Sequence, residues 1–181
     1  MTLSPALKQT ILIVCAIFVA DQSTKHAVLY GLDFISYAEG TRRIEVLPFF
    51  DLVLVWNRGI SYGLMQAGSD FERWLLVMVS IGLTLVLAWW RTQVSEPRLA
   101  LAIGIIIGGA LGNLVDRVVY GAVADFVLLH AFGFNWYVFN IADTAIVLGV
   151  ALMAWDVIFG AARPESKTLP PPRPQPPKRA G

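Results

Sequence analysis

The chain has 181 residues, of which 56% are hydrophobic and only 15% are charged, and its formal net charge is +1. A soluble domain of this size carries about 25% charged residues, so these values, with a mean hydropathy of +0.63, indicate a membrane protein. The net charge and the lack of a basic stripe give no indication of nucleic-acid binding. The single cysteine, Cys15, excludes an internal disulfide.

Four stretches are long and apolar enough to cross a bilayer, which takes roughly 20 residues. They are about Lys8–Leu29, Phe71–Trp90, Leu99–Val119 and Trp136–Phe159. The first is not followed by a small-residue cleavage site, so we interpret it as a retained helix and not as a cleaved signal peptide. The predicted fold class is membrane all-α, with a bundle of four transmembrane helices within residues 1–160.

Lysine and arginine residues near the ends of the stretches predict the orientation, because they accumulate on the cytoplasmic side. The side of the termini carries Lys8, Arg91 and Arg98, whereas acidic residues dilute the arginines of the opposite side. We therefore expect both termini in the cytoplasm. The polar residues of the bundle then converge on its outer end, namely Asp21, Lys25, Asp116, Arg117, Asp125, Asn140 and Asp143. Because charge within a membrane is costly, this convergence marks a candidate functional site.

Two segments outside the four stretches have a recognisable composition. The connection of residues 31–69 contains strand-like runs at Arg43–Val46 and Phe50–Val55, which predict a small β-sheet on the outer face between helices 1 and 2. Residues 161–181 are rich in proline and basic residues. Such a composition cannot form a core and predicts a disordered cytoplasmic tail.

The third stretch combines small residues with polar ones. Gly104, Gly108 and Gly112 recur every four residues, a spacing that lets two helices approach closely in lipid. Asn113 and Arg117 follow on the same helix, and structural pinning and ligand contact are equally open for both. Asp116 and Arg117 are successive and do not face each other, so we expect each to pair elsewhere.

The first stretch contains Asp21 and Lys25, spaced i, i+4, which can form an ion pair on one helical face. A pair exposed to lipid would be costly, so this face is expected to point into the bundle. The simplest interpretation is a structural ion pair, and the alternatives are that it shapes the electric field of the site or anchors the outer loop.

Asp125 and Asp143 are the candidate catalytic residues. Two carboxylates brought close in a low-dielectric site cannot both ionise easily, so they share a proton. Such a pair can activate a water molecule and donate a proton, as in aspartic proteases. The serines have no nearby histidine, and His26, His130 and Cys15 lack the spacing of metal ligands. We therefore expect neither a metal nor a cofactor.

Asn57, Gly59 and Gly63 follow the second strand-like run directly. An asparagine side chain can bind a peptide backbone, and the glycines allow close approach. From these residues alone, however, a plain turn is the simpler interpretation.

Five motifs together resemble those of the bacterial lipoprotein signal peptidases, also called signal peptidase II. They are Asp-Gln-Ser-Thr-Lys at 21–25, Asn-x-Gly at 57–59, Gly-Gly-x-x-Gly-Asn-x-x-Asp-Arg at 108–117, Val-x-Asp-Phe at 123–126 and Phe-Asn-x-Ala-Asp at 139–143. Each motif alone is weak, but the set is specific, and its spacing also fits the four helices.

The resemblance implies an aspartyl endopeptidase of the bacterial cytoplasmic membrane. Such an enzyme removes the signal peptide of a diacylglyceryl-modified prolipoprotein by cutting before the lipidated cysteine. Asp125 and Asp143 match the catalytic dyad. The positions that match lining or substrate-holding residues are Asn57, Gly59, Asn113, Arg117, Asn140 and Ala142, and those that match supporting residues are Asp21, Lys25 and Asp116.

Further expectations follow from the same resemblance. The connection of residues 31–69 resembles the β-cradle of the family, the loop after Asp125 resembles its gating element, and globomycin-like antibiotics are the expected inhibitors. The chain departs from the family at Ile60, Ser61 and Tyr62, and Ile60 is expected to alter the rim of the pocket. The expected partners are prolipoprotein and membrane lipid, and nothing in the sequence requires a second subunit, so a monomer is expected.

A small proton-coupled transporter is the alternative function, because intramembrane carboxylates can relay protons. A transporter needs acidic residues at several depths. Apart from Asp156, the inner half of the four stretches is apolar.

Overall fold

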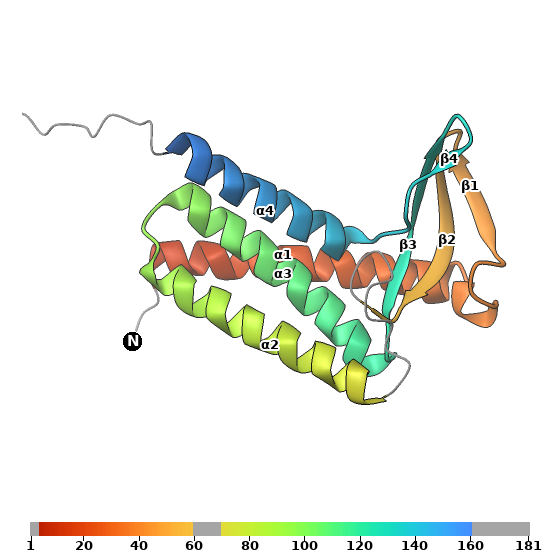
Figure 1. The fold of residues 1–181 in the computed structure, drawn as a ribbon, viewed down its shortest axis with the longest axis horizontal. Helices are drawn as coiled ribbons and strands as arrows, with labels where there is room; N and C mark the ends of the chain where they lie inside the picture. The colour runs from red at the N-terminus through yellow and green to blue at the C-terminus, as the bar shows by residue number, and fades with distance from the viewer. Residues whose placement is uncertain (1–3, 60–69, 161–181) are drawn as a thin grey trace, which may run out of the picture.

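The computed structural model describes residues 4–59 and 70–160 (Figure 1). Helix α1 (Pro5–His26) continues through a π-helical turn (Ala27–Gly31) and a short 3-10 helix (Phe34–Ser36) to strands β1 (Arg43–Leu47) and β2 (Phe50–Asn57). Helices α2 (Asp70–Gln93) and α3 (Pro97–Val119), strands β3 (Val123–Ala131) and β4 (Phe134–Asn135) and helix α4 (Ile141–Gly160) follow. The predicted tail and the departures at residues 60–62 lie outside the described residues.

The fold is mostly helical, with a small sheet at one end of the helices (Figure 1). Within the described part of the chain, three helices are long and apolar enough to cross a membrane: Pro5–Gly31, Asp70–Gln93 and Pro97–Val119. These three helices coincide with the first three stretches predicted from the sequence.

Helix α4 begins later than predicted, at Ile141 instead of about Trp136. The preceding segment is extended because its backbone pairs with β3. The Phe139 N–H donates to the Val127 carbonyl at 3.1 Å, and the Val127 N–H donates back to the Phe139 carbonyl at 2.8 Å. An apolar composition could not distinguish this extended segment from a helical turn.

Helix α3 packs against α1, α2 and α4, and glycines permit this close packing (Figure 1). A Cβ at Gly108 would lie 2.7 Å from the Ile17 Cβ of α1, and a Cβ at Gly109 would lie 2.6 Å from the carbonyl oxygen of Ala142 in α4. Gly112 faces Asp21. The close approach predicted from the small-residue ridge is therefore confirmed for Gly108 and Gly112, while a Cβ at Gly104 would make an ordinary contact at 3.4 Å.

The sheet has four antiparallel strands in the order β1-β2-β3-β4. We expected it within residues 31–69, but β3 and β4 come from the connection between α3 and α4. The prediction of a loop after Asp125 is also wrong, because Asp125 belongs to β3 and pairs with Val55 of β2. The first residues of β3 are buried on both faces, so their sequence lacks the alternation that identifies a half-exposed strand.

An apolar core joins the sheet to the end of α1. Val28, Leu29 and Phe34 pack with Leu54 of β2 and with Ala124 and Phe126 of β3. This core fixes the sheet against the bundle at the end where β3 carries Asp125.

Replacing Gly109 with alanine is expected to lower the thermal unfolding temperature of the purified protein and to reduce its activity. The new Cβ would contact backbone at the start of α4, so helix α4 has to shift, at a cost of about 1–3 kcal/mol. Gly82→Ala in α2 is the matched control, because nothing lies within 4 Å of its added Cβ. An equally stable and active Gly109→Ala protein would contradict this packing.

Candidate active site

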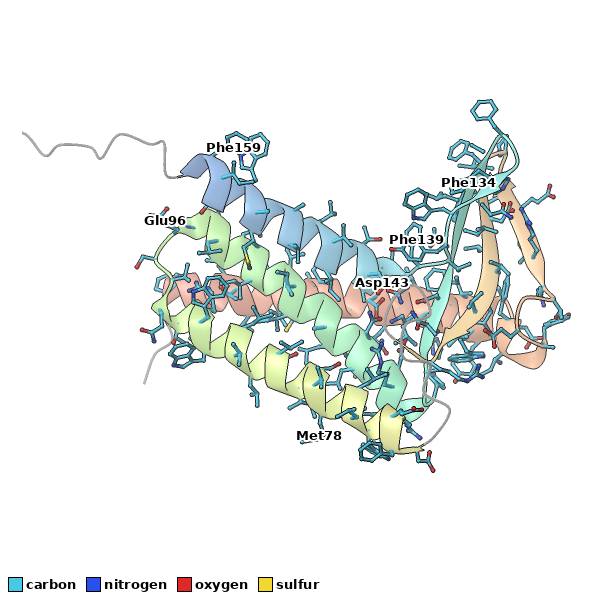
Figure 2. The ribbon with its side chains drawn as sticks, viewed as in Figure 1. Met78, Glu96, Phe134, Phe139, Asp143 and Phe159 are labelled. Atoms are coloured by element: carbon cyan, nitrogen blue, oxygen red, sulfur yellow. The ribbon has the colours of Figure 1, made fainter. Side chains whose placement is uncertain are left out.

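Asp125 and Asp143 come from different elements that meet where the bundle joins the sheet. Asp125 is near the start of β3, and Asp143 is in the first turn of α4. Figure 2 shows Asp143 at the end of α4 that lies nearest the sheet. The structure therefore brings the two predicted residues to the same region.

Asn140 bonds to both carboxylates. Its Nδ2 donates to Asp125 Oδ1 at 2.6 Å, and its backbone N–H donates to Asp143 Oδ2 at 3.3 Å. Its Oδ1 accepts the Asp143 N–H at 2.8 Å, an N-cap interaction that starts α4. Asn140 is completely buried, so one fixed side chain sets the position of both aspartates.

Each carboxylate also has its own amide donor. Asn57 Nδ2, at the end of β2, donates to Asp125 Oδ2 at 3.1 Å. Asn113 Nδ2, on α3, donates to Asp143 Oδ1 at 2.8 Å. Asn57, Asn113 and Asn140, all expected to line the site, thus contact the two aspartates.

The environment of Asp125 favours its protonated form. Burial raises the pKa of Asp125 to about 7, and the nearby negative charge of Asp143 acts in the same direction. Hydrogen bonds from Asn57 and Asn140 and the charge of Lys25 lower the pKa only in part. Two interacting carboxyls of this kind hold one proton between them near neutral pH.

A buried ion network adjoins the aspartates through Asn113, which contacts both Lys25 and Asp143. Lys25 Nζ is 2.8 Å from Asp21 Oδ2, 2.7 Å from Asp116 Oδ2 and 3.1 Å from Asn113 Oδ1. The i, i+4 pairing of Asp21 with Lys25 is confirmed, and Asp116 pairs with Lys25, on another helix, as expected for a residue that does not face Arg117.

The two acids of this network bind the backbone next to the two candidate catalytic residues. Asp21 Oδ1 accepts the N–H of Ala142 at 2.9 Å, and Asp116 Oδ2 accepts the N–H of Ala124 at 3.1 Å. Ala142 precedes Asp143, and Ala124 precedes Asp125. The network therefore positions the start of α4 and the start of β3 through one buried lysine.

Gln22 completes this network, and sequence reasoning missed its role. Its Nε2 donates to Asp21 Oδ2 at 3.1 Å, to Asp116 Oδ1 at 3.1 Å and to the Gly112 carbonyl at 3.2 Å. Gln22 thus supplies a neutral donor between two buried acids. The sequence places Gln22 beside Asp21, but it gives no signal for the contacts of Gln22 with α3.

Arg117 and Gly59 contact each other just beyond the end of β2. Arg117 Nη2 donates to the Gly59 carbonyl at 3.1 Å, and Nη1 donates to the Asn113 carbonyl at 3.3 Å. The Gly59 N–H donates to Asn57 Oδ1 at 3.1 Å. The buried Arg117 Nε has no partner among the described residues. Arg117 therefore fixes the backbone at Gly59 and at Asn113.

Arg73 of α2 is a second residue that sequence reasoning missed. Its Nε donates to the Arg117 carbonyl at 2.9 Å, and its Nη2 donates to the Val118 carbonyl at 2.7 Å. These bonds satisfy two of the carbonyls that a helix leaves free at its C-terminus. Arg73 thus fixes the end of α3, between Arg117 and the strand that carries Asp125.

The two carboxyls have the surroundings that suit an acid–base pair. Within residues 4–59 and 70–160, no group of three or more histidine, cysteine, aspartate or glutamate side chains could hold a metal ion. Paired carboxylates that share a proton can activate water with the ionised member and protonate the reacting group with the other. The fold and the site together define a membrane protein of the aspartyl-protease class.

Comparisons with known proteins agree with this class. Residues 13–159 match the family described as Signal peptidase (SPase) II. The lipoprotein signal peptidase of Methylobacterium sp. (strain 4-46) is 44% identical over 155 residues, which cover 86% of this chain and 92% of that protein. The lipoprotein signal peptidase of Methylobacterium radiotolerans is 48% identical over 132 residues, which cover 73% and 75%.

A solved structure of a bacterial membrane enzyme also superposes on this chain. It has a TM-score of 0.75 at 25% identity and covers 90% of this chain and 95% of its own. The chain belongs to the signal peptidase II family of bacterial membrane aspartyl proteases. The family does not favour the transporter alternative.

Replacing Lys25 with methionine is expected to lower the free energy of unfolding by about 3–5 kcal/mol, because two buried carboxylates lose their counter-ion. Lys8→Met is the control, since Lys8 lies on the same helix and is exposed. Thermal unfolding in detergent measures the effect. A Lys25→Met protein as stable as the Lys8→Met protein would contradict the network.

The proton held by Asp125 predicts a pH dependence. Between the ordinary carboxyl pKa and about 7, the folded protein retains a proton that the unfolded chain has released. Stability therefore falls as the pH rises through this window, and activity falls above about pH 7 as both carboxyls ionise. Thermal unfolding from pH 5 to pH 8 should show a weaker pH dependence in Asp125→Asn. An identical slope in both proteins would rule out this assignment.

Proposed function

We propose that this protein removes signal peptides from diacylglyceryl-modified prolipoproteins, cutting before the lipidated cysteine, with Asp125 and Asp143 as the catalytic dyad. Membership of the signal peptidase II family supports the reaction. The observation that carries the residue assignment is the bonding of Asn140 to both carboxylates. Through these bonds Asn140 holds the two carboxyls together, so that one can act as the acid and the other as the base.

The dyad works by a general acid–base mechanism. The ionised carboxylate takes a proton from a water molecule, and the resulting hydroxide attacks the carbonyl carbon of the scissile peptide bond. The protonated carboxyl donates its proton to the carbonyl oxygen as the tetrahedral intermediate forms. When the C–N bond breaks, a carboxyl proton passes to the departing amine of the lipidated cysteine. Asn57, Asn113 and Asn140 keep the two carboxyls oriented throughout.

Other polar residues support substrate binding. Arg117 Nε has no partner among the described residues, which supports a role in binding a substrate carbonyl. The Gly59 backbone is held by Arg117 and Asn57, which supports a role for this segment in holding the substrate. Ala142 is buried beside Asp143, and Asp21, Lys25 and Asp116 hold the frame.

The proposed membrane arrangement has four spans, with α4 as the fourth. Helix α4 exposes large apolar side chains along its length, including Leu148 and Ile158, which supports contact with lipid. The dyad and the sheet lie at one end of the bundle, and Lys8 and Arg91 lie toward the other. This charge distribution supports cytoplasmic termini and an active site at the outer face. The sheet then forms a cradle on that face, the catalytic domain ends near residue 160, and the tail is cytoplasmic.

Such a placement gives the lipid of the substrate a role in affinity. The diacylglyceryl chains remain in the bilayer while the scissile bond reaches the dyad just above it. Each buried methylene contributes about 0.8 kcal/mol to membrane anchoring, so lipidation both concentrates the substrate and sets its depth. A monomer suffices for this function, and globomycin-like cyclic peptides are the expected inhibitors.

Replacing Asp125 or Asp143 with asparagine is expected to reduce cleavage by roughly 10³-fold or more, because each variant lacks the acid or the base. The assay uses the purified full-length protein in lipid nanodiscs, a diacylated prolipoprotein and gel detection of the released signal peptide. Asp33→Asn is the control, since Asp33 is exposed and asparagine tolerates its left-handed backbone. Substantial turnover in either dyad variant would overturn the assignment.

A further inference from the structure

Two apolar cavities meet at Asp143. One, of about 640 Å³, lies between α4 and the sheet, and we call it the sheet-side cavity. The other, of about 470 Å³, lies between α2, α3 and α4, and we call it the helix groove. Asp143, Val147 and Tyr137 line both. A reacting bond placed at Asp143 would therefore have one cavity on each side.

Helix α4 forms the boundary between the two cavities. Asp143 and Val147, spaced i, i+4, form a ridge that both cavities share. Ile146 lies on one side of this ridge and lines only the helix groove, whereas Thr144 and Leu148 lie on the other and line only the sheet-side cavity. The two cavities are thus separate surfaces of one helix, divided along the line of a candidate catalytic residue.

The helix groove has the form of a site for an apolar helix. Its floor is a single stripe of α3, formed by Ile106, Ala110, Asn113 and Arg117. At about 1.5 Å per residue, this stripe is roughly 16 Å long and runs parallel to the bundle axis. Side chains of α2 and α4 form the two walls. Asn113 and Arg117, the polar residues of this stripe, lie at the end nearest Asp143, where a bound helix would give way to an extended scissile segment, while Ser80 and Thr84 are the polar residues of the α2 wall.

The sheet-side cavity has a different form. It runs from the first two turns of α4 to the tip of the sheet, where Phe49, Leu129, Phe134 and Trp136 line it. Phe139 lies between α4 and the sheet (Figure 2). The cavity continues onto the exposed apolar side of α4 at Leu148, whose side chain is 60% exposed. Flexible acyl chains can enter the cavity from the bilayer along this exposed side of α4.

We propose that the two cavities divide the substrate at the scissile bond. The apolar helix of the signal peptide occupies the helix groove, and the acyl chains of the diacylglyceryl-cysteine occupy the sheet-side cavity. Tyr137 and the Asp143–Val147 ridge keep the two parts apart. The inference rests on the proposed function and adds a separate recognition site for each half of the substrate.

Two matched substitutions test the division. Leu148 lines only the sheet-side cavity, Leu83 of α2 lines only the helix groove, and both are 60% exposed. Each is replaced with tryptophan to fill its own cavity. Leu85→Trp is the control, since Leu85 is 64% exposed on α2 and lines neither cavity. KM and kcat are measured in nanodiscs with dipalmitoyl and dioctanoyl forms of one prolipoprotein, and with a form whose signal-peptide leucines are replaced by alanine.

Leu148→Trp is expected to raise KM for the dipalmitoyl substrate at least about tenfold and to change KM for the dioctanoyl substrate little. Replacing the signal-peptide leucines with alanine should change KM by nearly the same factor in Leu148→Trp as in the unaltered protein. Leu83→Trp should raise KM equally for both chain lengths. In this variant, replacing the signal-peptide leucines with alanine should change KM by a clearly different factor than in the unaltered protein. The reverse pattern, or the same response in both variants, would overturn the division. Failure of the proposed function is recognised separately, because the unaltered protein would then release no signal peptide from any substrate.

Discussion

The structure depends on one buried cation. Lys25 is the shared counter-ion of Asp21 and Asp116, which would otherwise lack a cation in an apolar interior. Each acid in turn holds a backbone N–H that precedes a candidate catalytic aspartate. These buried charges are costly, but their interactions also join α1, α3, α4 and β3. The stability of the fold and the placement of the two candidate catalytic aspartates therefore depend on the same interactions.

The close packing of α3 follows from the same requirement. The carboxyl of Asp21 can reach both Lys25 and the start of α4 only because Gly112 leaves space beside it, and Gly109 lets the backbone of α4 approach. Arg73 then fixes the C-terminal end of α3, next to Asp116, by binding its free carbonyls. A rigid frame of this kind suits acid–base chemistry, which needs two carboxyls held in a fixed relation.

The secondary-structure predictions that depend on interactions between residues close in the sequence are correct, whereas those that depend on residues far apart in the sequence are wrong. The first three helices and the Asp21–Lys25 pair depend on local periodicity, and the structure has them where the sequence indicates. The structure has strand β3 where the sequence predicts a loop, and an extended segment before Ile141 where the sequence predicts a helix, because both segments are shaped by pairing with distant strands. Gln22 and Arg73 were missed for the same reason, since their partners lie on other helices.

The sequence by itself determined the membrane class of this protein, its polar cluster and the identity of the residues that could carry out acid–base chemistry. Motif spacing was sufficient for these, because apolar length and residue type are local properties. Only the tertiary structure decided that one asparagine bonds both carboxyls, that burial raises the pKa of Asp125 to about 7, and that two apolar cavities meet at Asp143. Each of these properties arises between elements far apart in the chain, where desolvation and mutual distance, and not composition, set the energy of a charge.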